Sequence, residues 1–341
     1  MAPLTVPPHT RPPRPGWQTA AMTSISQDSS STQADPSSAS VLVIANAAAG
    51  SAEDEDVDRV LSTLASLAET DVIVPDGAEG LEKALRSAKG RDVVVMGGDG
   101  SLHWVLQTAS EHDLLDELGA IGLVPMGTGN DFARGMELPL DLMDAARVAV
   151  EGERMEADLL EDEDGGVVVN VAHIGVAAVA TSHAEGFKDA IGAAGYAAGA
   201  LTAGVSTRGW EVVVHVDGEE VLDKDEDALL VSLALGSSVG GGTTVAPDAS
   251  HTDRKVDVVV ATGIRVRDRA GFAADLRRGI HAQRDDVTVY QGTEVTIASV
   301  DPDKDFLVNV DGDLGPRYHS RTWTLRPAAW VCRVPSSSAD H

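Results

Sequence analysis

The chain has 341 residues, of which 43% are apolar, and this is enough for two ordinary domains with substantial cores. Asp and Glu number 54 against 26 Lys and Arg, which gives a formal net charge of -28 at pH 7. A surface with this charge repels the phosphates of DNA and RNA, so we expect no nucleic acid as a partner. Few of the basic residues are Lys, and abundant acid with little Lys favours a halophilic protein whose self-repulsion is screened by salt.

Targeting and redox signals are few. Cys332 is the only cysteine, which excludes an internal disulfide and fits a reducing compartment. No apolar run reaches the roughly 18 residues of a transmembrane helix, and the start of the chain lacks the apolar segment of a signal peptide. We therefore expect a cytoplasmic protein. Residues 1–39, rich in Pro, Ser and Thr, and residues 335–341 are expected to be disordered tails, with Met22 as an alternative start.

Residues 40–152 alternate between short apolar stretches and longer amphipathic ones. The short stretches are bounded by turn residues and predict strands, at 41–45, 72–74, 92–96 and 121–125. The longer stretches have apolar residues at helical spacing and predict helices, at 54–68, 80–88, from 102 onward and at 141–151. Strands separated by helices of this length indicate βαβ units, so we predict an N-terminal Rossmann-like domain with a doubly wound parallel sheet.

From residue 153 to 320 the pattern changes to strands joined mainly by turns. We predict strands at 155–160, 166–172, 210–216, 228–235, 256–261, 286–290, 294–298 and 306–311, and helices near 187–203 and 267–281. This pattern is typical of antiparallel folds and predicts a C-terminal β-sandwich domain. Residues 321–334 are predicted to return to the first domain.

Three loops rich in small residues each follow a predicted strand of the first domain. The middle loop, Gly-Gly-Asp-Gly-Ser at 97–101, lies between a buried strand and a helix start, an arrangement that binds anions through backbone amides. The other two are residues 46–50 and 127–131, and all three meet at the carboxyl edge of a parallel sheet, where α/β folds bind ligands. Three such loops suit a nucleoside triphosphate with Mg²⁺. The sequence has neither a Walker A motif nor the dinucleotide GxGxxG pattern, so neither of those binding modes is indicated.

Taken in order, these loops resemble the diacylglycerol kinase catalytic family, which includes soluble bacterial lipid kinases and sphingosine kinases. The resemblance rests on residues 46–50, on Gly-Gly-Asp-Gly-Ser at 97–101 and on Gly-Thr-Gly-Asn-Asp-Phe-Ala-Arg at 127–134. It continues in the β domain with Asn-Val-Ala-His-Ile-Gly at 170–175, Lys188, Tyr196, Gly-Gly-Gly at 240–242, Ala-Pro-Asp-Ala-Ser at 246–250 and Val-Asp-Gly-Asp at 310–313. The match covers residues 41–334.

The resemblance implies a two-domain kinase with its active site in the cleft between the domains, and with ATP and Mg²⁺ as cofactors. It implies transfer of the γ-phosphoryl group to the hydroxyl of a diacylglycerol-like or isoprenoid lipid at a membrane surface, and it favours a homodimer. The chemistry of such kinases is mainly positioning and neutralisation of charge.

The family's motifs assign roles to positions of this chain. The nucleotide-binding residues would be Asn46, Gly50, Gly97, Gly98, Asp99, Gly100, Ser101, Gly127, Thr128, Gly129 and Asn130. Asp99, Asp131 and Asp158 would position the catalytic Mg²⁺, and a structural Mg²⁺ site would use Ser250, Asp253 and the carbonyl of Lys255. The catalytic residues would be Asp99, Asp311 and Asp313, with Asp313 as the general base for the lipid hydroxyl.

Some positions depart from the family's pattern. Asp313 stands where the family has a glutamate, and a displacement of about 1 Å in a reacting group can cost roughly 10²-fold in rate. Arg254 replaces a glycine beside the structural metal site, and His103 and Trp104 replace asparagine and glutamate. From the sequence alone we interpret His103 as a surface or packing residue of a helix.

Two other functions stay open. NAD kinases share the Gly-Gly-Asp-Gly loop and the fold, although the motif at 127–132 is similar to that of the lipid kinases instead. Alternatively, the chain is a non-catalytic relative that binds nucleotide or lipid, which the changes at Asp313 and Arg254 would explain.

Overall fold

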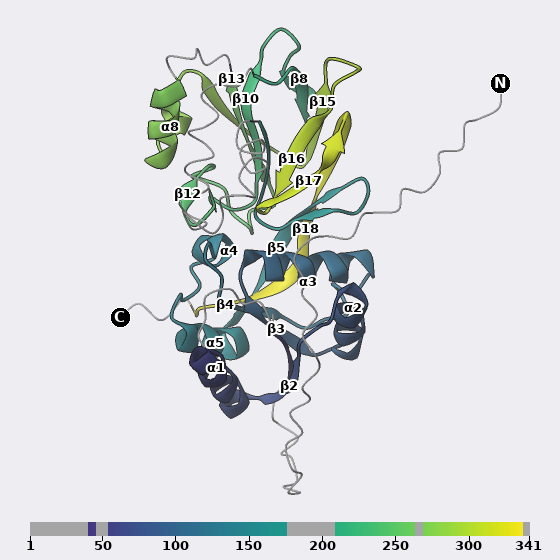
Figure 1. The fold of residues 1–341 in the computed structure, drawn as a ribbon, viewed down its shortest axis with the longest axis vertical. Coiled ribbons are helices and arrows are strands. Elements are labelled where there is room, and N and C mark those ends of the chain that lie inside the picture. The colour runs from purple at the N-terminus through teal and green to yellow at the C-terminus, as the bar shows by residue number, and fades with distance from the viewer. Residues whose placement is uncertain (1–39, 46–53, 176–208, 263–268, 337–341) are drawn as a thin grey trace, which may run out of the picture.

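The computed structural model describes residues 40–45, 54–175, 209–262 and 269–336, which form an α/β lobe and a β-rich lobe (Figure 1). The predicted helix at 187–203 and the site residues Asn46 and Gly50 lie outside the described residues. Among the described helices, none is long and apolar enough to cross a bilayer.

The α/β lobe is built on four parallel strands in the order β2-β1-β3-β4. Its elements are β1 (Ser40–Ala45), α1 (Asp54–Leu67), β2 (Glu69–Ile73), α2 (Ala78–Ser87), β3 (Asp92–Gly97), α3 (Asp99–Glu111), β4 (Ile121–Pro125), α4 (Asp131–Gly135) and α5 (Leu142–Glu151). Apolar residues of α1 and α5 pack on one face of the sheet, and those of α2 and α3 pack on the other. The predicted doubly wound architecture is confirmed.

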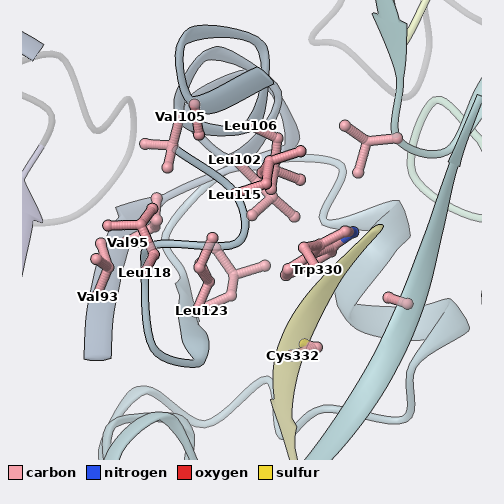
Figure 2. Close-up of a cluster of buried hydrophobic side chains, with 14 of the residues drawn as sticks. Val93, Val95, Leu102, Val105, Leu106, Leu115, Leu118, Leu123, Trp330 and Cys332 are labelled. Carbon is pink, nitrogen blue, oxygen red and sulfur yellow. The ribbon is translucent and has the colours of Figure 1, made fainter. Parts of the chain in front are cut away.

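A buried cluster between α3 and the sheet forms the core of this lobe nearest to the β-rich lobe. Figure 2 shows Leu102 and Leu106 of α3 beside Leu123 of β4, with Trp330 and Cys332 contributed by the last strand of the chain. Cys332 is fully buried, and burial raises the pKa of its thiol to about 12. This cysteine is therefore a core residue and not a reactive one.

The β-rich lobe is a sandwich of antiparallel strands. Its elements are β5 (Glu153–Asp162), β6 (Val167–Val168), β7 (Val171–Gly175), β8 (Val212–Val216), β9 (Glu219–Leu222), β10 (Ala228–Ala234), β11 (Ser238–Val239), β12 (Thr243–Thr244), β13 (Val256–Thr262), α8 (Arg269–Arg277), β14 (Val287–Gly292), β15 (Glu294–Ser299), β16 (Phe306–Val310), β17 (Asp313–Tyr318) and β18 (Ser320–Val334). One layer is the six-stranded sheet β14-β13-β10-β7-β16-β17, and the other contains β18, β15, β8 and β9. Alternate residues of both layers fill the space between them.

A single strand, β18, belongs to both lobes. Its first half pairs antiparallel with β15 (Trp323 opposite Val295), and its second half pairs parallel with β4 (Cys332 opposite Ile121). The two halves are separated by a bulge at which Ala328 has a φ of 52°. The parallel sheet and one layer of the sandwich are therefore one continuous ten-stranded sheet, and the sequence pattern did not predict this continuity.

Candidate active site

The loop at 97–101 forms the turn between β3 and the first residues of α3. It crosses the loop after β4 so closely that a Cβ atom on Gly98 would lie 2.8 Å from the Cα of Gly127, and a Cβ on Gly127 would lie 2.6 Å from the Cα of Gly98. Glycine is required at both crossing positions for this reason. A Cβ on Gly100, in the first turn of this 13-residue helix, would meet nothing within 4 Å. The glycine loop thus lies at a helix N-terminus, a position at which backbone amides can bind an anion.

The loop at 127–130 is held by the side chain of Asn130. Its Oδ1 accepts from the amide of Gly127 at 3.1 Å, and its Nδ2 donates to the carbonyls of Pro125 and Gly127 at 3.2 and 2.8 Å. Asn130 adopts a left-handed conformation (φ 52°), which asparagine tolerates better than most residues. Asn130 thus shapes the loop through its own contacts, while Thr128 is exposed.

Asp99 and Asp131 link three elements at the boundary between the lobes. The carboxylate of Asp99 accepts from the amides of Asp131 and Phe132, both at 3.0 Å, and so binds the start of α4. The carboxylate of Asp131 accepts from the Oγ of Ser238 and from the amides of Gly241 and Gly242, each at 2.8 Å. The α/β lobe and the β-rich lobe are joined here by buried hydrogen bonds to charged groups, which are the stronger kind.

The two carboxylates converge on Gly129. A Cβ atom there would lie 3.1 Å from Oδ2 of Asp99 and 3.3 Å from Oδ2 of Asp131. Burial raises the pKa of Asp99, and the nearby charges of Asp131 and Asp311 raise it further. The hydrogen bonds from the amides of Phe132 and Asp131 act in the opposite direction, but the pKa stays above its ordinary value. A cation would relieve this repulsion, and Mg²⁺ is commonly held by one or two carboxylates together with substrate phosphates. Asp99 and Asp131 therefore fit a catalytic Mg²⁺ that arrives with a nucleotide.

Asp158 has a different set of contacts. Its fully buried carboxylate accepts from the amide of Arg254 at 2.9 Å, from the guanidinium of Arg254 at 2.6 Å and from the amide of Ala328 at 2.8 Å. Arg254 also bonds Glu156 at 2.7 Å. The charge of Asp158 is thus compensated by an arginine of the chain itself, and these bonds tie β5 to the turn after residue 250 and to the bulge of β18.

The three residues predicted for a structural Mg²⁺ fit such an ion poorly. Asp253 is exposed and its Oδ1 accepts from the amide of Lys255 at 3.1 Å, while the Oγ of Ser250 contacts Thr252 at 3.2 Å. The set offers one exposed carboxylate, which two cationic residues, Arg254 and Lys255, follow directly in the chain. No group of three or more acidic, His or Cys side chains suited to a metal occurs within the described ranges. The buried carboxylate of this region, Asp158, already has a cation in Arg254.

We predict that Arg254→Ala lowers the free energy of unfolding by about 2–3 kcal/mol. Removing one partner of a buried pair costs about 3–5 kcal/mol, and the 40% exposure of the Arg254 side chain reduces that figure. Arg254→Gly should lower the free energy of unfolding by about 0.5–1 kcal/mol less than Arg254→Ala does, because glycine adopts the φ of 66° at this position without steric strain. The measurement is the urea unfolding midpoint, with Arg147→Ala, which breaks an exposed pair with Asp144, as the control. Midpoints of both Arg254 variants equal to that of the control would contradict the role given to Arg254.

Asp311 lies on the turn between β16 and β17, and Asp313 is the first residue of β17. The buried carboxylate of Asp311 accepts from the amides of Val169, Asn170 and Val171 at 2.8, 2.8 and 2.9 Å. Asp313 is two residues further on and exposed, so its carboxylate is open to an incoming group.

A polar network that the sequence did not predict surrounds these residues. Asn170 donates to the carbonyl of Ser238 at 2.7 Å and contacts Nε2 of His251 at 3.1 Å, and His251 packs edge-on against Phe132 at 4.9 Å. His103 of α3 contacts Asp311 at 2.8 Å. Asn170 belongs to a motif of the family and His103 departs from one, but their partners lie far away in sequence, and no local signal identifies such pairs.

Comparisons with known proteins agree with this architecture. Residues 40–161 match the model of the diacylglycerol kinase catalytic domain, and residues 170–330 match the YegS C-terminal NAD kinase beta sandwich-like domain. The chain is 26% identical to a diacylglycerol kinase of Staphylococcus carnosus over 224 residues, 65% of this chain and 70% of that protein. It is 26% identical to lipid kinase YegS of Escherichia coli K12 over 246 residues, 71% of this chain and 78% of that protein. A crystal structure of a putative diacylglycerol kinase from Bacillus anthracis covers 87% of this chain and 98% of its own at a TM-score of 0.73 and 18% identity, which shows a shared fold.

Proposed function

We propose that this chain, which belongs to the diacylglycerol kinase catalytic family, transfers the γ-phosphoryl group of ATP to the hydroxyl of a lipid with the help of Mg²⁺. The observation that carries the proposal is the convergence of Asp99 and Asp131 on Gly129, beside the N-terminus of α3. Carboxylates for a metal and amides for phosphates are the parts that phosphoryl transfer needs in one place.

Each lobe supplies some of the residues for the proposed reaction. The glycine loop and the first amides of α3 would bind phosphate oxygens, and Asp99 and Asp131 would hold Mg²⁺ by their carboxylates. When bound, Mg²⁺ would neutralise charge on the phosphates. Asp313 accepts the proton of the lipid hydroxyl as its oxygen forms the new bond to phosphorus, and ADP leaves with the electrons of the broken P–O bond.

The test is transfer of radiolabel from γ-labelled ATP to lipids in vesicles, with Mg²⁺ and at high salt because of the acidic surface. The panel holds a diacylglycerol, a dialkylglycerol ether and a polyprenol, with NAD as a soluble acceptor. We expect label in at least one lipid and none in NAD. Label in NAD alone identifies an NAD kinase, and ATP binding without transfer to any acceptor identifies a non-catalytic relative. Either result would overturn the proposal.

We predict that Asp313→Asn lowers kcat for lipid phosphorylation by about 10²-fold or more, because the amide cannot accept the proton. Asp313→Glu should stay within about tenfold of the unmodified protein, since it keeps the base and changes its reach by one methylene. Asp303→Asn, in an exposed turn of the same lobe, is the control and should leave kcat unchanged. Equal activities of Asp313→Asn and the control would remove Asp313 from the mechanism.

A further inference from the structure

The phosphate site and the proton acceptor of the proposed reaction lie in different lobes. Asp99 stands in the first turn of α3 in the α/β lobe, and Asp313 begins β17 in the β-rich lobe. Phosphoryl transfer depends on a fixed distance between the phosphate site and the proton acceptor, and an error of about 1 Å costs roughly 10²-fold in rate. Some contact must therefore hold the turn before β17 against α3.

His103 makes this contact. It lies four residues after Asp99 on α3, and residues at this spacing share one face of a helix. Nδ1 of His103 is 2.8 Å from Oδ2 of Asp311, and the two side chains are only 10% and 3% exposed. The bond crosses the boundary at which Figure 1 shows α3 lying beneath the β-rich lobe.

Asp311 links the contact with His103 to the position of Asp313. Its carboxylate also accepts from three consecutive amides, those of residues 169–171, so four hydrogen bonds fix it. Asp311 itself has a left-handed backbone (φ 49°), and Gly312 follows with a φ of 95°. The oxygen of Asn309 accepts from the amide of Gly312 at 3.1 Å. The turn is thus rigid, and the place of Asp313 follows from that of Asp311.

The hydrogen bond between His103 and Asp311 requires a donor on the side chain of residue 103, but it does not require a positive charge there. Burial opposes ionisation of Asp311, but the hydrogen bond from His103 and those from the amides of Val169 and Asn170 hold its pKa below the usual value. The carboxylate is therefore ionised at neutral pH, and Nδ1 of His103 carries the hydrogen. The Nδ2 of an asparagine occupies nearly the same place, one bond beyond Cγ, and can donate in the same way.

We propose that His103 is a positioning residue which, through Asp311, holds the turn that carries Asp313 against the helix that begins at Asp99. This role rests on the kinase function proposed above. It gives His103 no part in moving the proton.

The experiment compares His103→Ala and His103→Asn with the unmodified protein, and uses His112→Ala as the matched control. His112 ends the same helix and makes only a partly exposed contact with Glu82 at 3.4 Å. We expect His103→Ala to lower kcat about 10- to 100-fold while the KM for ATP changes by less than about threefold. We expect His103→Asn to stay within about threefold of the unmodified kcat, and His112→Ala to have no effect. Thermal melting of each variant verifies that it is folded.

Two kinetic results overturn the positioning role. An unchanged kcat in His103→Ala shows that the contact is dispensable. Equal losses in His103→Ala and His103→Asn, with both variants folded, show that the imidazole itself takes part in the chemistry.

Hydrogen exchange separates failure of this role from failure of the kinase function. The amides of residues 169–171 and 312–313 should exchange at least about tenfold faster in His103→Ala, and at the unmodified rate in His103→Asn. This readout needs no substrate, so it decides whether the contact holds the turn even when no lipid is phosphorylated. Unchanged exchange in His103→Ala overturns the positioning role by itself.

Discussion

Asp99→Asn is expected to reduce kcat for lipid phosphorylation about 10³-fold while the fold is retained. The amide keeps one oxygen, which can accept from one of the two backbone amides at the start of α4, but it removes the negative charge that faces Asp131 across Gly129. Since the charge of Asp131 raises the pKa of Asp99, removing the charge of Asp99 relieves the repulsion between the two side chains. The variant should therefore lose Mg²⁺-dependent catalysis without a comparable loss of stability.

The measurement is kcat at saturating ATP and Mg²⁺, together with the urea unfolding midpoint. Asp116→Asn, an exposed carboxylate in the loop after α3, is the matched control and should behave as the unmodified protein. A kcat within about tenfold of the control would remove Asp99 from the metal site. A large fall in the unfolding midpoint would instead assign to Asp99 a structural role at α4.

Acid is expected to destabilise the protein between about pH 6.5 and pH 4, before the carboxylates become protonated. Burial lowers the pKa of His173 and of His251 to about 4, from an ordinary value near 6.5. Below pH 6.5 the unfolded chain binds protons on both residues and the folded protein does not. The stabilisation is therefore complete above pH 6.5, and it is lost as the pH falls towards 4.

Each histidine contributes up to about 1.4 kcal/mol of lost stability per pH unit in this interval, and roughly 3 kcal/mol by pH 4. Asp99 acts in the opposite direction, because its raised pKa lets the folded state bind a proton first. The lowered pKa of Asp311 adds a further loss only below its unfolded value of about 3.9. We therefore expect a net fall in stability that is close to the sum for the two histidines, less the contribution of Asp99.

The measurement is the urea unfolding midpoint as a function of pH. His251→Gln cannot titrate and should have a lower midpoint at pH 7.5, because it disturbs the contacts with Asn170 and Phe132, but a flatter profile towards pH 4.5. A midpoint that is constant from pH 7.5 to pH 5 in the unmodified protein would show that the two histidines are not buried in their neutral form.

The fold class could be predicted from the sequence because its signals are local. The run from Val93 to Met96 is fully buried, and the glycines after it stand where two loops cross. The sequence pattern does not predict strand β17, because Gly315 and Pro316 are typical of a turn. Proline is tolerated at this position because β17 is the edge strand of its sheet. The continuity of the sheet through β18 depends on pairs such as Cys332 with Ile121, and single-sequence periodicity does not identify pairing partners.

The candidate site could be predicted in part for the same reason. Asp99 is recognisable from its neighbours in the chain, because a glycine loop before a helix has a local signature. His103 and Asp311 are 208 positions apart, so their contact is a product of the tertiary fold. The sequence likewise showed Arg254 as an unusual residue, but its bond with Asp158 appears only when β5 and the turn after residue 250 are brought together.

The order of synthesis has a consequence for strand β18. The ribosome makes the residues of β4 and β15 before those of β18, which then enter the sheet between them. Until residues 320–334 emerge, β4 and β15 each have an unpaired edge, and unpaired edges are where chains associate wrongly. The nascent protein is therefore at its most vulnerable to aggregation just before β18 emerges, and the two halves of the ten-stranded sheet join only when this strand has been inserted.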